Sequence, residues 1–192
     1  MKAPPGPPTR QRRYLEGVAL LLLTISAILF QSSATSSWIE TTAADGARYQ
    51  VSPIGVKQYH DHDAQPASEC RWWPRLGNAQ LCAVNDVGGP SQMEWLRRAY
   101  PLTVAALWMS VLALFLNALR VPRQAPAVHV IAALAPSVLG AVALWSMWFG
   151  ATRALAVLEG LTPQPVLSGF GPVVTATVLA TTAAVLLLVA RR

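Results

Sequence analysis

The chain has 192 residues, of which 53% are hydrophobic and only 12% are charged, and its formal net charge is +6. Soluble domains contain about 25% charged residues, so this composition excludes an ordinary soluble domain and indicates a membrane protein. A net positive charge is also typical of nucleic-acid binding, but here the basic residues lie beside apolar segments instead of forming one patch. We therefore expect the lipid bilayer, and no nucleic acid, as a partner.

Four apolar segments are long enough to cross a bilayer, which takes about 20 helical residues. A basic, proline-rich tail at residues 1–13 precedes them and is expected to be disordered and cytoplasmic. The predicted spans are residues 14–32, 101–119, 127–149 and 172–190. The predicted connections are an extracytoplasmic domain at 33–100, a cytoplasmic loop at 120–126 and a second outer loop at 150–171. The first span also fits a cleaved signal peptide, and this alternative stays open.

Local patterns refine the second, third and fourth spans. Pro101 is expected at the first helical position of the second span, where a missing N–H costs nothing, and residues 91–100 are expected to form a helix that leads into it. Small residues recur every four positions in the last two spans and predict close helix packing. These residues are Ala133, Ser137 and Ala141 in span three, and Ala176, Ala180 and Ala184 in span four. Pro136 and Gly140 predict a kink in span three.

The charges predict the orientation of the spans. With the N-terminus in the cytoplasm, the inner segments hold eight basic residues and one acidic residue, Glu16, whereas the outer segments hold seven basic and eight acidic residues. Basic residues next to spans favour the cytoplasmic side. We therefore expect both termini inside and residues 33–100 outside a plasma membrane or bacterial inner membrane.

The outer domain contains the only two cysteines, Cys70 and Cys82. Residues 48–59 mix β-branched and aromatic residues with Gly and Pro, which predicts one or two short strands. Between the cysteines, Gly77-Asn78 is a turn signal, and a hairpin stapled by its own cysteines is expected. Both cysteines face the oxidising side, where disulfides persist. The predicted fold is thus an all-α membrane bundle of four transmembrane helices with a small, disulfide-stapled, partly β extracytoplasmic domain.

This layout resembles the claudin-like superfamily of four-span membrane proteins. Trp38 matches the position of the family's tryptophan in the first loop, Cys70 and Cys82 match its loop disulfide, and Arg97 or Arg98 lies where the family has an arginine at the start of the second span. The Gly-Leu-Trp element that precedes the family's first cysteine is missing here. Glu69 stands before Cys70, and two tryptophans follow it.

The resemblance implies a non-enzymatic role in membrane organisation, adhesion or service as an accessory subunit, with the outer domain recognising a protein partner or a second copy of the chain. Trp and Arg dominate binding hot spots, which makes the residues around the first cysteine candidates. The candidate partner-binding residues are Trp38, Arg71, Trp72, Trp73, Arg75, Arg97 and Arg98. The alternative is a small transporter or channel component that uses the kinked third span.

The sequence contains one weak candidate for a metal site. His60 and His62 alternate with Asp61 and Asp63, and in a strand both imidazoles would share a face suited to zinc or copper. Four adjacent residues in a polar loop seldom close such a site, and a solvated loop or a pH sensor are the other interpretations. No nucleophile elbow, carboxylate dyad or second cysteine pair is present. We expect neither an enzyme nor a cofactor.

Overall fold

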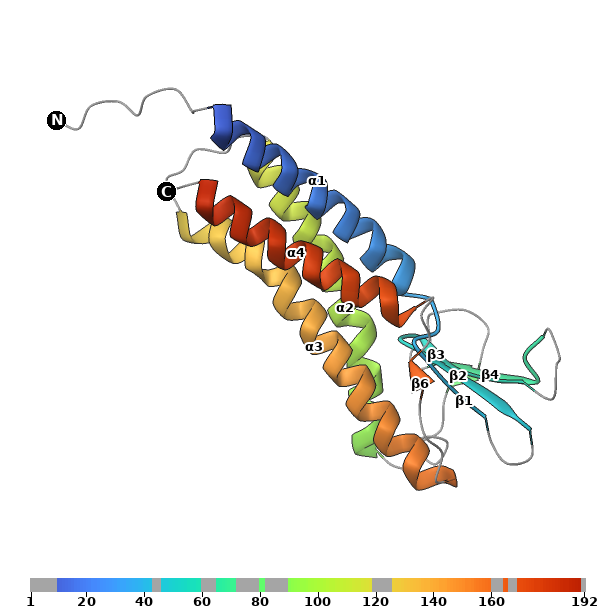
Figure 1. The fold of residues 1–192 in the computed structure, drawn as a ribbon. Helices are drawn as coiled ribbons and strands as arrows, with labels where there is room; N and C mark the ends of the chain where they lie inside the picture. Colours follow the sequence, from blue (N-terminus) through green and yellow to red (C-terminus); the bar gives the residue numbers. More distant parts are fainter. Residues whose placement is uncertain are drawn as a thin grey trace.

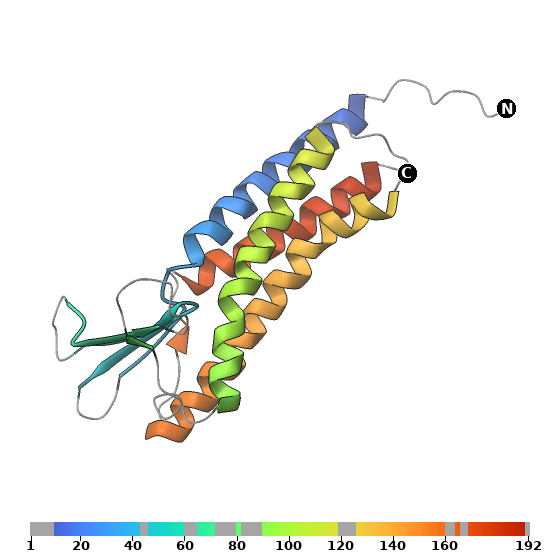
Figure 2. The same ribbon diagram turned by 180° about the vertical axis from the view of Figure 1, so that it is seen from behind.

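A computed structural model of the protein describes residues 10–42, 46–59, 65–71, 80–81, 90–118, 126–159, 164–165 and 169–190. Four long helices lie side by side, and a small β-sheet covers one end of the bundle (Figure 1). The start of α1 and the end of α4 lie together at the other end, as the reverse view also shows (Figure 2). The helices are α1 (Arg10–Ser33), α2 (Pro90–Ala118), α3 (Pro126–Glu159) and α4 (Phe170–Ala190).

The helices form a closed ring in which α1 contacts α2 and α4, and α3 contacts the same two helices. Each helix is long and apolar enough to cross a membrane, over Arg10–Ser33, Glu94–Ala118, Ile131–Arg153 and Phe170–Ala190. Large apolar side chains remain exposed on all four helices, for example Ile28, Trp108, Val138 and Val178. An apolar surface this extensive is unusual for a protein in water and is what hydrocarbon chains contact in a bilayer. The four predicted spans are confirmed as four candidate membrane helices.

Small residues do face the bundle interior, although not all of the predicted ones. Ala176, Ala180 and Ala184 of α4 are fully buried, as the four-residue spacing predicts. In α3, Ala133 is buried but Ala141 is exposed, so that part of the prediction is wrong. Steps of four residues drift by about 40° each on a helix with 3.6 residues per turn. The buried stripe of α3 therefore mixes steps of three and four, and continues through Ala143 and Met147.

Two helices continue beyond the predicted spans on the side of the sheet. α2 begins at Pro90 and runs without a break into the second span, which confirms the predicted helix before it. Pro101 consequently lies inside α2 and not at its first position. α3 runs on to Glu159, so the predicted outer loop at 150–171 begins as a helix. The residues after Phe149 include Ala, Leu, Arg and Glu, which favour helix even where the segment becomes too polar for hydrocarbon.

The sheet has the strand order β5-β4-β3-β2-β1-β6. Its four central strands are β1 (Ile39–Thr42), β2 (Arg48–Ser52), β3 (Gly55–Tyr59) and β4 (Ser68–Arg71), and they pair antiparallel. The edge strands β5 (Gln80–Leu81) and β6 (Gln164–Pro165) have two residues each. Residues 48–59 form two strands, β2 and β3, which confirms the prediction of one or two strands there. The predicted second outer loop supplies β6, whose proline suits an edge strand because it has no N–H to donate.

The predicted hairpin between the cysteines is wrong, because β5 pairs with β4 in parallel. Cys70 lies opposite Gln80, and Arg71 lies opposite Leu81. A two-residue turn joins antiparallel strands only, whereas a parallel pair needs a longer crossover between its strands. The turn signal Gly77-Asn78 and Cys82 lie outside the described residues.

Candidate functional site

One face of the sheet packs onto the helix bundle. Cross-strand pairing aligns Ile39, Val51, Val56 and Cys70 in a single row, and residues opposite each other in a ladder point to the same face. Ile39 and Val51 are buried in one hydrophobic core with residues of all four helices, among them Leu96 and Met147, and Val56 and Cys70 pack against that core. The sheet is therefore a fixed continuation of the bundle and not a separate domain.

The opposite face of the sheet is polar, and we call it the outer face. Its central row pairs Glu40 with Gln50, Gln50 with Lys57, and Lys57 with Glu69. A second row aligns Thr42, Arg48 and Tyr59. Charges of both signs alternate across this surface, which faces away from the helices.

Two ion pairs organise the charges of the outer face. Arg48 Nε lies 3.2 Å from Glu40 Oε1, and the guanidinium carbon of Arg48 lies 4.9 Å from the ring centroid of Tyr59. Arg71 Nη2 lies 3.1 Å from Glu69 Oε1. Such partly exposed pairs contribute about 0–1 kcal/mol to folding. These charges are thus not needed to hold the fold, and another charged surface can compete for them at little cost in stability.

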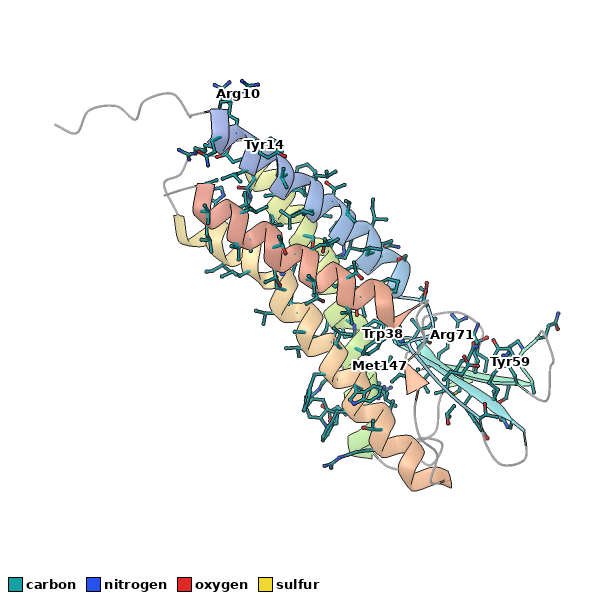
Figure 3. All side chains as sticks on the ribbon, in the orientation of Figure 1. Arg10, Tyr14, Trp38, Tyr59, Arg71 and Met147 are labelled. Atoms are coloured by element: carbon teal, nitrogen blue, oxygen red, sulfur yellow. The ribbon has the colours of Figure 1, made fainter. Side chains whose placement is uncertain are left out.

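Trp38 fastens the sheet to the ends of α1 and α4. Its side chain is fully buried, and Nε1–H donates a hydrogen bond of 2.7 Å to the carbonyl oxygen of Ser33, the last residue of α1. Its ring contacts Phe170 of α4 edge to face, at 6.4 Å between centroids. Its backbone N–H donates to the carbonyl of Val51 in β2. Trp38 and Met147 belong to one hydrophobic core, and Figure 3 labels both near the place where bundle and sheet meet.

Of the predicted partner-binding residues, Trp38 lies in the core, and its buried side chain cannot touch a partner. Arg71 lies on the outer face of the sheet, in its ion pair with Glu69 (Figure 3). Arg97 is half-buried and Arg98 is exposed, both on the part of α2 near the sheet. Because Trp38 is buried, the four of these residues that the structure describes do not form one exposed site. Trp72, Trp73 and Arg75 lie outside the described residues.

The cysteines and histidines are only partly described. Cys70 lies in the inner row of the sheet, where it packs against the core, whereas Cys82 lies outside the described residues. His60 and His62 lie outside them too. Among the residues that the structure describes, no three His, Cys, Asp or Glu side chains come close enough to hold a metal ion.

The sequence prediction did not identify the outer face as a surface. Its residues, from Glu40 to Arg71, are separated by up to 31 positions. Their strands had to be aligned before Glu40, Lys57 and Glu69 became neighbours. One local signal was present in β3, where the apolar Val56 is followed by the charged Lys57. Alternation predicts a strand with one polar face, but it does not predict which strands lie beside it.

Comparison with known proteins assigns the chain to no family. No protein-family model matches the chain, and no curated protein is significantly similar to it.

Proposed function

We propose that the protein is a non-enzymatic integral membrane protein that recognises a protein partner through the outer face of its sheet. Membrane organisation, adhesion and service as an accessory subunit are the roles that suit this arrangement, as the resemblance to claudin-like proteins implies. One observation carries the proposal. The inner face of the sheet is committed to the bundle core, while the outer face presents Glu40, Arg48, Lys57, Glu69 and Arg71 with both signs of charge.

The proposed orientation places the sheet outside the cell and both termini in the cytoplasm. The start of α1 and the end of α4 lie at the end of the bundle opposite the sheet (Figure 1). The first turn of α1 carries Arg10, Arg12 and Arg13, and basic residues beside spans favour the cytoplasmic side. In this orientation the sheet meets either a second membrane or the outer part of a neighbouring protein.

A disulfide between Cys70 and Cys82 is part of the proposal. Gln80, two residues before Cys82, pairs with Cys70 across β4 and β5, which brings the two segments side by side. No cysteine in the described part of the chain is free. In the chain-entropy model, closing a loop of about a dozen residues contributes roughly 3 kcal/mol. That is a large share of the stability of a small sheet whose β5 strand has two residues.

The competing role as a small transporter or channel needs space beside Pro136 and Gly140, where the sequence predicts a kink in α3. Pro136 is fully buried, and Gly140 packs so tightly that an added Cβ would meet Thr177 Oγ1 and lie 2.9 Å from Phe30 Cζ. Helices in such close contact leave no room for a solute at this level. The packing therefore favours the recognition role.

Photo-crosslinking in intact membranes tests the proposed surface. Replacing Lys57 or Gln50, both on the outer face, with p-benzoylphenylalanine should give adducts with a protein after irradiation. The matched control carries the same group at Val178, which is 57% exposed on α4 within a candidate membrane span, and should give none. An adduct of twice the chain's mass would identify a second copy as the partner.

Two outcomes would contradict the proposal. The first is the absence of protein adducts from both outer-face positions in membranes that hold the correctly folded chain. The second is solute flux in liposomes containing only this protein that Arg48→Glu with Arg71→Glu leaves unaffected.

A further inference from the structure

Three aromatic side chains form a cluster on α2 and α3, near the ends of these helices that lie beside the sheet. Trp95 of α2 meets Phe149 of α3 edge to face, with 5.3 Å between ring centroids. Trp145, one turn along α3, stacks on Phe149 at 5.8 Å with 17° between the ring planes. Trp145 is 60% exposed, so one side of the cluster is open to the surroundings. We call Trp95, Trp145 and Phe149 the aromatic cluster.

Two arginines each lie over one ring of this cluster. The guanidinium carbon of Arg98 lies 5.2 Å from the Trp95 ring, and that of Arg153 lies 4.4 Å from the Phe149 ring. Side chains on a helix lean toward its N-terminus, and α2 and α3 run in opposite directions. The side chain of Arg98 therefore leans toward the sheet end of the bundle, and that of Arg153 leans away from it. Both guanidiniums thus lie at the level of the Trp95–Phe149 contact.

The cluster lies at the expected boundary between hydrocarbon and headgroups. Trp148 contacts Phe170, the first residue of α4, at 6.1 Å between centroids, and a candidate span begins there. The guanidinium of Arg153 lies at the level of Phe149, which comes one residue after Trp148, or about 1.5 Å further along the helix. The headgroup layer on each side of the hydrocarbon core is roughly 5–8 Å thick. Both guanidiniums thus fall at the inner edge of the headgroup layer, with Trp145 about one turn deeper.

The charges of the cluster suit an anion. Arg98 donates a hydrogen bond to Glu94, but both side chains are more than half exposed, at 52% and 63%, so this pair contributes little to stability. Arg98, Glu94 and Arg153 together carry one net positive charge. A guanidinium stacked on a ring keeps the N–H groups at its edge available, and their fork fits two oxygens of a phosphate.

We propose that Arg98 and Arg153 bind the phosphate of an anionic phospholipid in the leaflet beside the sheet, while Trp145 contacts its acyl chains. A lipid without a compensating amine, such as phosphatidylglycerol, suits the net charge better than zwitterionic phosphatidylcholine. This site is separate from the outer face of the sheet, and its test does not depend on whether that face binds a protein.

Native mass spectrometry of the full chain in detergent tests the site, with phosphatidylglycerol and phosphatidylcholine of identical acyl chains as probes. The unaltered protein should retain more phosphatidylglycerol than phosphatidylcholine. Arg98→Gln with Arg153→Gln should lower this preference about thirtyfold, because two cations near an anionic lipid contribute about 1 kcal/mol each. The matched control is Arg48→Gln with Arg71→Gln, which removes the same charge from the outer face and should leave the preference unchanged.

Two further variants keep the test decisive if the double glutamine variant folds poorly. Arg98→Lys with Arg153→Lys keeps both charges and should keep most of the preference, whereas Glu94→Gln removes the competing carboxylate and should raise it. Equal retention of the two lipids by the unaltered protein would overturn the proposal. A loss of preference in the Arg48/Arg71 control as large as in the Arg98/Arg153 variant, or no change with Glu94→Gln, would overturn it too.

Discussion

Gly169 lies directly against the backbone of Ser37. A Cβ at position 169 would collide with the carbonyl oxygen of Ser37, and it would lie 2.6 Å from the carbonyl carbon and 2.9 Å from Cδ1 of Trp38. Gly169 comes just before α4, and Ser37 comes just before β1, so this contact holds the start of the last helix against the start of the sheet. Only a residue without a side chain allows the two backbones to approach this closely.

Gly169→Ala is expected to lower the free energy of unfolding by about 1–3 kcal/mol, since the obstacle is backbone that cannot rotate away. Thermal unfolding in detergent measures the effect. Gly171→Ala is the control, because nothing lies within 4 Å of a Cβ at Gly171. Equal melting temperatures for the two variants would show that the contact with Ser37 is looser than described.

Trp38→Phe should destabilise the protein although it keeps most of the apolar surface. It removes the indole N–H that donates to the carbonyl of Ser33, the last residue of α1. That carbonyl also accepts from the backbone N–H of Ser36 at 3.3 Å, so the expected loss is that of one hydrogen bond, about 0.5–1.5 kcal/mol. Denaturant or thermal unfolding measures the difference from Trp108→Phe, where the ring is 64% exposed on α2. If the two variants unfold alike, the indole hydrogen bond does not contribute to holding the sheet in place.

Ser26→Ala should weaken the contact between α1 and α4. The fully buried Ser26 Oγ donates a hydrogen bond of 2.8 Å to the carbonyl of Ala176 across the two helices. Side-chain hydrogen bonds between membrane helices contribute about 0.6 kcal/mol on average, so a loss of roughly 0.5–1.5 kcal/mol is expected. Reversible unfolding in mixed micelles measures this loss in the free energy of unfolding. Thr24→Ala, whose hydroxyl bonds to Leu20 within α1, should have a smaller effect.

Gly140→Ala should strain the crossing of α3 with α1 and α4, because the new methyl group would meet Thr177 Oγ1 and the buried ring of Phe30. Thr177→Ala removes one of these obstacles. We therefore expect the double variant to recover part of the stability lost in Gly140→Ala, a coupling that a double-mutant cycle of unfolding energies measures. Strict additivity would contradict the packing. Gly17→Ala on the exposed side of α1 serves as the neutral control.

Reduction should destabilise the protein by roughly 3 kcal/mol if Cys70 and Cys82 form the proposed disulfide. Thermal unfolding with and without reductant measures the loss, and alkylation before and after reduction counts the thiols. Cys70→Ser with Cys82→Ser should unfold at the lower temperature with or without reductant. Two thiols that react with an alkylating agent in the unreduced, unfolded chain would disprove the bond.

Local patterns of the sequence determined the elements. Long apolar segments predicted four helices, because a bilayer sets a minimum length for a span. The β-branched and aromatic residues within 48–59 predicted strands, and the four-residue spacing of Ala176, Ala180 and Ala184 predicted the buried face of α4. Each of these properties depends on residues within a few positions of one another, so periodicity alone reveals them.

Only the tertiary structure decided how distant segments meet. The parallel pairing of β5 with β4, the addition of β6 to β1, the burial of Trp38 and the alignment of Glu40 with Gln50 and Lys57 all join segments that no local pattern connects. The same is true of the aromatic cluster, in which Trp95 and Phe149 are more than fifty positions apart. Contacts of this kind depend on strand register and on how far α2 and α3 continue past the predicted spans. Both properties are fixed only when the whole core packs together.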